Sequence, residues 1–228
     1  MLRRSASVLP SSGPGFIPLA IRSSPDTGNL GSNQCMIGVR YSGDYTAQIK
    51  FTTNDQLEVH DYRTSYKLQK VTNRRFRDTT GWYHIVVSND NSVSSPDTKI
   101  YVNGVEQSNY STRNNPSVNT DLQANNSVIQ VVGANYYNSQ ANVTHDGYIA
   151  EFYMIDGQQL APSAFAEDDG GTWSAIEYTG TFGTAGFHLD FADSSDLGND
   201  VSGNGEHFAE VNIVSGNQIT SNLPPFKS

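Results

Sequence analysis

Residues 81–88, which read GWYHIVVS, and residues 99–107, which read KIYVNGVEQ, decide the fold class. The first stretch alternates two sets of side chains that are both largely apolar, as expected of a central strand covered on each side. In the second stretch, Asn103-Gly104 separates two alternating runs, and both residues tolerate the positive φ of a type I′ turn. Together the stretches predict a central strand followed by a β-hairpin.

Similar short runs follow one another along the chain, each bounded by Gly, Asn or Asp. Roughly ten such runs, with turn signals between them, predict an all-β antiparallel two-sheet sandwich of the jelly-roll kind. One or two helical turns are expected at Leu160–Glu167, and residues 108–127 are expected to form a long polar loop. The strands that bear on this prediction are Gln34–Arg40, Tyr45–Thr52, Gln56–Tyr62, Gly81–Ser88, Lys99–Val102, Val128–Gly133, Tyr148–Ile155, Gly186–Ala192 and Phe208–Val214.

The core follows from the same alternation. In Tyr148–Ile155 the even positions are wholly apolar and should face the core, while the odd positions include Glu151. The residues expected to be deeply buried are Trp82, Ile85, Phe152, Met154, Phe187 and Phe191.

Composition divides the chain into three parts: an extended N-terminal arm at 1–33, rich in Ser, Pro and Gly, a sandwich at 34–214, and a polar C-terminal tail at 215–228. The arm contains a short apolar island that cannot bury itself alone. We therefore expect the island to dock on another subunit or on a neighbouring protein. Its residues are Phe16, Ile17, Leu19 and Ile21.

Charge and composition exclude several classes of function. With 14 Lys+Arg against 23 Asp+Glu, the net charge of −9 argues against a nucleic-acid partner. No run approaches the ~18 apolar residues of a membrane span, so no membrane insertion is expected. The single cysteine, Cys35, allows no intrachain disulfide and is expected to be a small core residue.

Catalytic patterns are missing, so we do not expect an enzyme. Glycan hydrolysis would need two carboxylates about 5–9.5 Å apart. Glu151 has Ile149 and Tyr153 as its same-face neighbours, not a second carboxylate. The acidic run at 167–171 ends in Gly-Gly and predicts a turn. The five histidines are scattered without the spacing of zinc ligands.

Calcium is the one metal that the residues suggest, and no other cofactor is expected. Hard oxygen ligands gather between residues 190 and 200, and calcium takes six to eight such oxygens. The alternative is that these side chains cap turns between the last strands. The candidate ligands are Asp193, Asp196, Asn199 and Asp200.

A loop expected at residues 134–142, ANYYNSQAN, supplies aromatic rings beside amides, the combination that holds sugar rings. The alternative is that its tyrosines cover a sheet edge or face another subunit, because Tyr is also common in protein interfaces. The candidate ligand-binding residues are Asn135, Tyr136, Tyr137 and Asn138, extended by Tyr110 and Arg113 from the long polar loop.

Several motifs together resemble a known family. The segments FRD (76–78), WYHIVV (82–87) and KIYVNG (99–104) are similar to those of laminin-G-like, concanavalin-A-like sandwiches. The second half resembles virion structural proteins of tailed, especially marine, bacteriophages, and the resemblance covers about residues 28–214. Its segments are DGYIAEF (146–152), IDGQ (155–158), LAPSAF (160–165), YTGTFG (178–183), GFHLDF (186–191) and LGNDVSGNG (197–205).

The resemblance implies a virion structural protein with a lectin-like sandwich, used as a capsid decoration, tail-fibre or adhesin module. Its partners would be other virion proteins and copies of itself, and it would be made in the host cytoplasm. The alternative is a glycan-binding module that recognises the host cell surface, and a glycan-cleaving enzyme is a third reading. The family's WVKRG strand is missing before Asn29-Leu30-Gly31. Either the sheet lacks an edge strand, or the arm supplies a different one.

Overall fold

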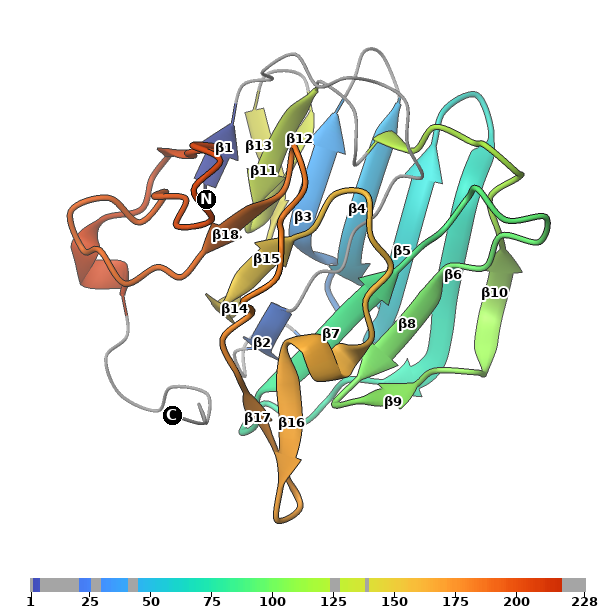
Figure 1. The fold of residues 1–228 in the computed structure, drawn as a ribbon, viewed down its shortest axis with the longest axis horizontal. Helices are drawn as coiled ribbons and strands as arrows, with labels where there is room; N and C mark the ends of the chain where they lie inside the picture. Colours follow the sequence, from blue (N-terminus) through green and yellow to red (C-terminus); the bar gives the residue numbers. More distant parts are fainter. Residues whose placement is uncertain are drawn as a thin grey trace.

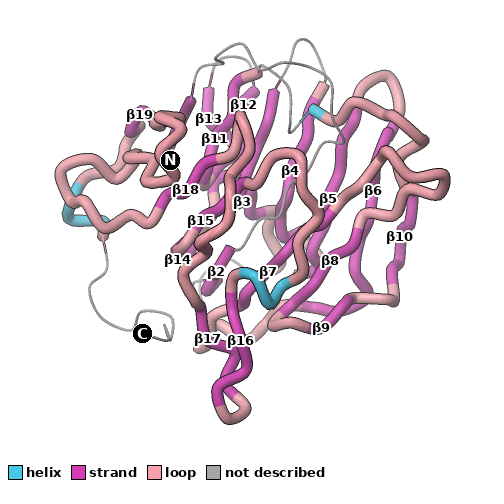
Figure 2. Tube along the Cα trace, in the orientation of Figure 1, coloured by secondary structure: helices cyan, strands magenta, loops and turns pink. Residues whose placement is uncertain are grey.

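The protein is described by a computed structural model at residues 2–4, 21–25, 30–40, 45–123, 128–137 and 140–218, with side chains except at 2–4, 21–25, 40, 137 and 140–141. Two antiparallel sheets face each other, with the larger sheet behind the smaller one in Figure 1. The predicted all-β antiparallel sandwich is confirmed. Helix is confined to short turns (Figure 2), and no helix within the described ranges has the length and apolarity to cross a membrane.

The larger sheet has eight strands in the order β10-β6-β5-β4-β3-β11-β1-β19, and the smaller has five in the order β14-β2-β7-β8-β9. The strands of the larger sheet are β10 (Tyr110–Asn114), β6 (Tyr66–Arg75), β5 (Gln56–Tyr62), β4 (Thr46–Phe51), β3 (Gln34–Arg40), β11 (Ile129–Val132), β1 (Leu2–Arg4) and β19 (Ala209–Glu210). Those of the smaller sheet are β14 (Gly147–Ala150), β2 (Ile21–Pro25), β7 (Tyr83–Ser88), β8 (Lys99–Val102) and β9 (Val105–Glu106).

Three two-stranded pairs complete the fold, and one of them, β16–β17, projects from the body at the lower end of Figure 1. The predicted helical turn is present as a single 3₁₀ turn. These elements are β12 (Ala134–Tyr137) with β13 (Gln140–Thr144), β15 (Phe152–Met154) with β18 (Phe187–Leu189), β16 (Ala166–Asp169) with β17 (Thr172–Ala175), and the 3₁₀ turns η2 (Pro162–Ala164) and η3 (Ser215–Asn217).

The main core lies between the two large sheets and takes alternate side chains from each strand. From the larger sheet, Ile49 and Leu57 point inward, and from the smaller one Ile85 and Val87 do so. Strand β7 is buried at every position because a second apolar cluster around Val86 covers its other face. The expectation of a central strand covered on both sides is therefore confirmed.

The hairpin β12–β13 lies against the outer face of the larger sheet and forms a small third cluster there with Val131. Gly38 of β3 makes this contact possible. A Cβ atom at Gly38 would lie 2.7 Å from the carbonyl oxygen of Ala134 and 2.7 Å from Cα of Asn135. Any larger residue would push the hairpin away from the sheet.

The predicted boundary between arm and sandwich is wrong in part. Leu2–Arg4 pairs with β11 and β19, and Ile21–Pro25 pairs with β14 and β7. The segment before Asn29 thus supplies a strand to the smaller sheet. This agrees with one of the two alternatives given above for the missing WVKRG strand, namely that the arm supplies a different one. Phe16, Ile17 and Leu19 lie outside the described residues, so docking of the apolar island stays a prediction.

The predicted strand Tyr148–Ile155 is broken into β14 and β15 at Glu151, whose φ is 51°. This left-handed residue lets β14 pair with β2 while β15 pairs with β18. Because the alternation changes at the break, Ile149 contacts the core together with Phe152, while Tyr148 is 43% exposed. The prediction that all even positions face the core was wrong for Tyr148.

Four of the six predicted core residues are deeply buried, namely Ile85, Phe152, Met154 and Phe187. Trp82 and Phe191 are only half-buried. Trp82 precedes the first paired residue of β7, and Phe191 has a φ of 56° just after β18 ends, so neither belongs to the alternation of its strand.

Replacing Phe152, which is fully buried and stacks on Phe187 with ring centroids 5.8 Å apart, should lower the free energy of unfolding strongly. For Phe152→Ala we expect a loss of about 3–5 kcal/mol in a denaturant melt. The control is Tyr148→Ala on the neighbouring exposed strand, for which the loss should stay within about 0.5 kcal/mol. Equal losses for the two variants would contradict the assignment of faces on either side of Glu151.

Candidate functional site

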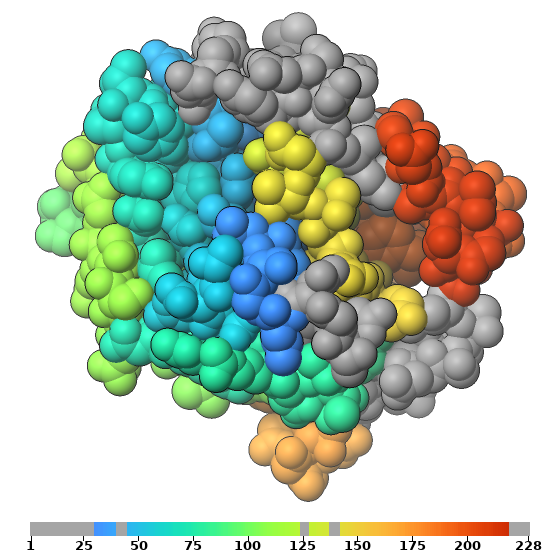
Figure 3. All heavy atoms as spheres, turned by 180° about the vertical axis from the view of Figure 1, so that it is seen from behind, coloured from blue at the N-terminus to red at the C-terminus, as the bar shows by residue number. Residues whose placement is uncertain are grey.

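The outer face of the larger sheet is built by the alternation of β4, β5 and β6. In β4 the inward residues are Ala47, Ile49 and Phe51, which leaves Thr46, Gln48 and Lys50 on the outer face. In β5 the core takes Leu57 and Val59, so the even positions from Glu58 to Tyr62 point outward. Figure 3 views this side of the molecule, with the hairpin β12–β13 in yellow beside β4 and β5.

Strand register aligns the outward side chains in three rows that cross the strands. The residues of the aromatic row are Thr46, Tyr62 and Tyr66, those of the polar row are Gln48, His60, Gln69 and Asn114, and those of the charged row are Lys50, Glu58 and Val71. Neighbouring rows lie about 7 Å apart, because same-face residues are two positions apart along a strand.

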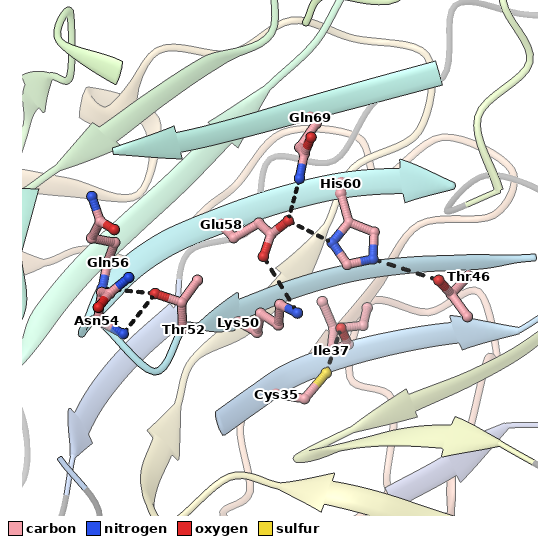
Figure 4. A network of polar contacts seen from close by, with 10 residues as sticks. All are labelled: Cys35, Ile37, Thr46, Lys50, Thr52, Asn54, Gln56, Glu58, His60 and Gln69. Carbon is pink, nitrogen blue, oxygen red and sulfur yellow. Dashed lines mark hydrogen bonds and ion pairs between the residues drawn. The ribbon is translucent and has the colours of Figure 1, made fainter. Parts of the chain in front are cut away.

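Glu58 is the centre of the charged row and is 7% exposed. Its Oε1 accepts a hydrogen bond from Nε2 of Gln69 at 2.9 Å and lies 3.3 Å from Nδ1 of His60, while its Oε2 lies 3.3 Å from Nζ of Lys50 (Figure 4). Burial opposes ionisation of Glu58, but the hydrogen bonds from His60 and Gln69, with the charge of Lys50, outweigh it and lower the pKa to about 2. The carboxylate is therefore held in place and ionised at neutral pH.

The aromatic row provides the apolar surface of the face. Tyr62 and Tyr66 meet edge to face with ring centroids 5.0 Å apart, and Tyr66 also meets the ring of His60 edge-on at 5.9 Å. Tyr66 is 43% exposed, so one ring stays open to solvent next to the polar row. The outer face thus combines an exposed aromatic ring with amide, imidazole and carboxylate groups held in fixed positions.

The residues that the sequence predicted for glycan binding are placed differently. Residues 134–137 and 140–144 form the paired strands β12 and β13, and Ala134 and Tyr136 of β12 pack with Val131 of the larger sheet. Tyr136 is 6% exposed and Asn135 7%, so both side chains are buried against the sheet and not open on a loop as expected, and their part in ligand binding stays a prediction. The side chain of Tyr137, and Asn138 as a whole, lie outside the described residues.

Tyr110 and Arg113 belong to strand β10, so the expected loop is wrong here, while their part in ligand binding stays a prediction. They join an ion-pair cluster around the buried Lys70: its Nζ lies 2.5 Å from Oδ1 of Asp97 and 4.7 Å from the ring centroid of Tyr110. Arg113 reaches the other oxygen of Asp97 at 3.1 Å. Burial lowers the pKa of Lys70, and Asp97 offsets part of this effect. Both residues thus contact the Lys70–Asp97 pair, with Tyr110 half-buried and Arg113 exposed.

Two of the four candidate calcium ligands, Asp193 and Asp200, cap turns, which is the alternative that the sequence left open, and calcium binding stays a prediction. Asp193 accepts hydrogen bonds from the backbone and hydroxyl of Ser195, and Asp200 accepts backbone N–H bonds from His188, Ser202 and Glu206. These backbone donors outweigh burial and lower the pKa of Asp200. Within the described ranges, no group of three or more His, Cys, Asp or Glu residues could hold a metal ion.

A second polar cluster sits at the break between β14 and β15. Oε2 of Glu151 accepts a hydrogen bond from Oη of Tyr153 at 2.9 Å and lies 2.9 Å from Nε2 of His188. The rings of Tyr153 and His188 stack with centroids 3.9 Å apart. The cluster ties the left-handed residue to β18 and accounts for a glutamate at a position where glycine would be less strained.

Sequence reasoning missed the outer face of β4–β6. The signal was present in QLEVHDY at residues 56–62, where apolar and polar residues alternate. Alternation predicts which side chains leave the core, but it does not reveal which outward face lines up aromatic and amide groups from several strands. That information lies in the pairing register, which sequence alone did not provide.

Comparisons with known proteins add little to this picture. No protein-family model matches the chain, and no curated protein matches it. One similar solved structure is Domain 4 of AbnA, a GH43 extracellular arabinanase from Geobacillus stearothermophilus, in complex with arabinotriose. The two chains are 18% identical with a TM-score of 0.45, and the match covers 67% of this chain and 65% of that chain. A likeness this weak does not bear on what the present chain binds.

The Glu58 cluster should make stability depend on pH in acid. Because the folded pKa of about 2 lies below the ordinary value of 4.5, ionised Glu58 stabilises the fold above pH 4.5, and this contribution disappears as pH falls toward 2. At pH 7 the free energy of unfolding of the wild-type protein should exceed that of Glu58→Gln by on the order of 1–3 kcal/mol, with solvent screening allowed for. Denaturant melts between pH 7 and pH 2 measure the difference.

The control for this experiment is Glu106→Gln, which removes an exposed carboxylate 3.7 Å from Lys99. The free energy of unfolding of Glu106→Gln should differ little from that of the wild-type protein at every pH. If the difference in free energy of unfolding between wild type and Glu58→Gln stayed the same down to pH 2, the low pKa of Glu58 would be contradicted.

Proposed function

We propose that the protein is a non-catalytic carbohydrate-binding β-sandwich that holds a glycan on the outer face of β4–β6. The observation that carries this proposal is the exposed ring of Tyr66 beside the polar row. Aromatic rings stack on the apolar faces of sugars, and fixed amide and imidazole groups bond their hydroxyls. Small-molecule sites combine apolar surface and a few fixed polar groups in this way.

The packing around this face supports its use as a binding surface. The apolar cluster with Val86 covers the outer side of the smaller sheet, and the hairpin β12–β13 covers β3 and β11 of the larger one. Of the outward residues described on β4–β6, all but the half-buried Val71 are instead polar or aromatic. Glu58 contacts three neighbouring side chains, so His60, Gln69 and Lys50 are held in place before any ligand arrives.

The same geometry favours binding over catalysis. A glycosidase needs a carboxylic acid whose pKa is raised so that it can protonate the leaving oxygen. Burial raises the pKa of Glu58, but the hydrogen bonds from His60 and Gln69 and the charge of Lys50 outweigh burial and lower the pKa to about 2. At neutral pH Glu58 therefore has no proton to donate. The buried carboxylate of Glu58 instead holds the side chains of Gln69, His60 and Lys50 in place.

Affinity electrophoresis through gels that contain arabinan, xylan, β-glucan, mannan or alginate tests the proposal. We expect at least one polysaccharide to retard the wild-type protein, and Tyr66→Ala to weaken that binding about tenfold or more. The matched control is Tyr148→Ala, because Tyr148 is also 43% exposed but lies on the smaller sheet. Retention of binding in Tyr66→Ala, or equal loss in both variants, would contradict the assignment of the face.

We also propose that the module is carried on a bacteriophage particle, as a capsid decoration, tail-fibre or adhesin component. Support for this setting comes from the sequence segments at 146–165 and 178–205. Mass spectrometry of purified particles that encode the chain should detect its peptides at stoichiometric levels. Their absence from intact particles would overturn the virion setting without affecting glycan binding.

A further inference from the structure

The polar row crosses the strands, and its direction indicates how a bound glycan would be oriented on the sheet. Gln48 pairs with His60, His60 pairs with Gln69, and Gln69 pairs with Asn114, so the row runs perpendicular to four adjacent strands. With strands about 4.8 Å apart, the row is about 14 Å long. This length corresponds to roughly three sugar units in a linear chain.

Both ends of the row are defined by the fold. At one end, Gln48 pairs with Gly38, and above Gly38 stands the hairpin residue Asn135. At the other end, Asn114 lies on β10, the edge strand of the larger sheet, and its Nδ2 donates to the carbonyl oxygen of Tyr66 at 3.1 Å. A chain along the row therefore meets the hairpin at one end and leaves the sheet edge at the other.

The chemistry of the row is that of an uncharged ligand. Three of its four side chains are primary amides, each with both donors and an acceptor, which match sugar hydroxyls. Recognition of carboxylate or sulfate groups relies on Arg or Lys side chains that can turn toward the anion. The neighbouring cation, Lys50, is already held 3.3 Å from Glu58. The net charge of −9 also repels polyanions.

We infer that the outer face binds a neutral, linear oligosaccharide of about three units laid across the strands along Gln48, His60, Gln69 and Asn114. This inference rests on the proposed function and adds to it the class, the length and the orientation of the ligand. One sugar ring stacks on Tyr66, and the following units place their hydroxyls over the polar row. Binding energy thus accumulates unit by unit until the row is filled.

Titration calorimetry tests the inference with cello-, xylo-, manno- and arabino-oligosaccharides of one to six units, and with oligogalacturonates as the anionic series. We expect one neutral series to bind, with affinity rising about tenfold or more from one unit to three and levelling off beyond about four. Gln48→Ala and Asn114→Ala, which remove opposite ends of the row, should each reduce the gain with length. Gln107→Ala, on a half-buried glutamine after β9, is the matched control.

The possible outcomes distinguish failure of the ligand's class, length or orientation from failure of glycan binding itself. Binding that depends on Tyr66 but is independent of chain length, or that prefers oligogalacturonate, overturns the orientation or the class and leaves the glycan-binding face intact. Binding with normal length dependence in both end variants also overturns the orientation. No binding of any series by the wild-type protein overturns the proposed function itself. Circular dichroism and melts confirm that each variant is folded.

Discussion

The period-two alternation of strands β4, β5 and β6 is the constraint on which both the core and the outer face depend. Leu57 and Val59 must enter the core, and the same backbone then forces Glu58 and His60 to the opposite side. A register slip of one residue would bury Glu58 and expose Leu57. The hydrophobic core therefore determines which polar groups reach the outer face and in what order.

Close approach of the backbone adds a second constraint. The hairpin β12–β13 lies on the larger sheet because Gly38 has no side chain at the point of contact, and Val131 and Tyr136 fill the space around it. On the smaller sheet, Phe165 and Tyr153 pack over Val86 in a separate cluster. Each sheet thus has one apolar outer covering besides the shared core, and the polar surface of β4–β6 lies next to one of them.

Much of the fold could be read from the sequence, because strand alternation and the Asn103-Gly104 turn are local signals. The central strand, the hairpin after it and four of the six expected core residues were predicted correctly in this way. The break at Glu151 could not be, since it depends on pairing with β2 and β18 and on a clasp formed with His188. The expected exposure of Tyr136 was wrong for a related reason, because β12 packs on the sheet and buries this ring, which no local signal indicates.

The placement of charges explains why an uncharged row can exist in an acidic protein. On the outer face Lys50 is held against Glu58, and on the inner side of the same sheet Lys70 is held against Asp97, so these cations are paired before any ligand binds. Removing one partner of such a pair would leave a buried charge uncompensated, which is far more costly than losing an exposed pair. Both cations are therefore engaged within the protein. Hydrogen bonds from the amide groups of Gln48, Gln69 and Asn114, and not a net charge, then decide what this face can recognise.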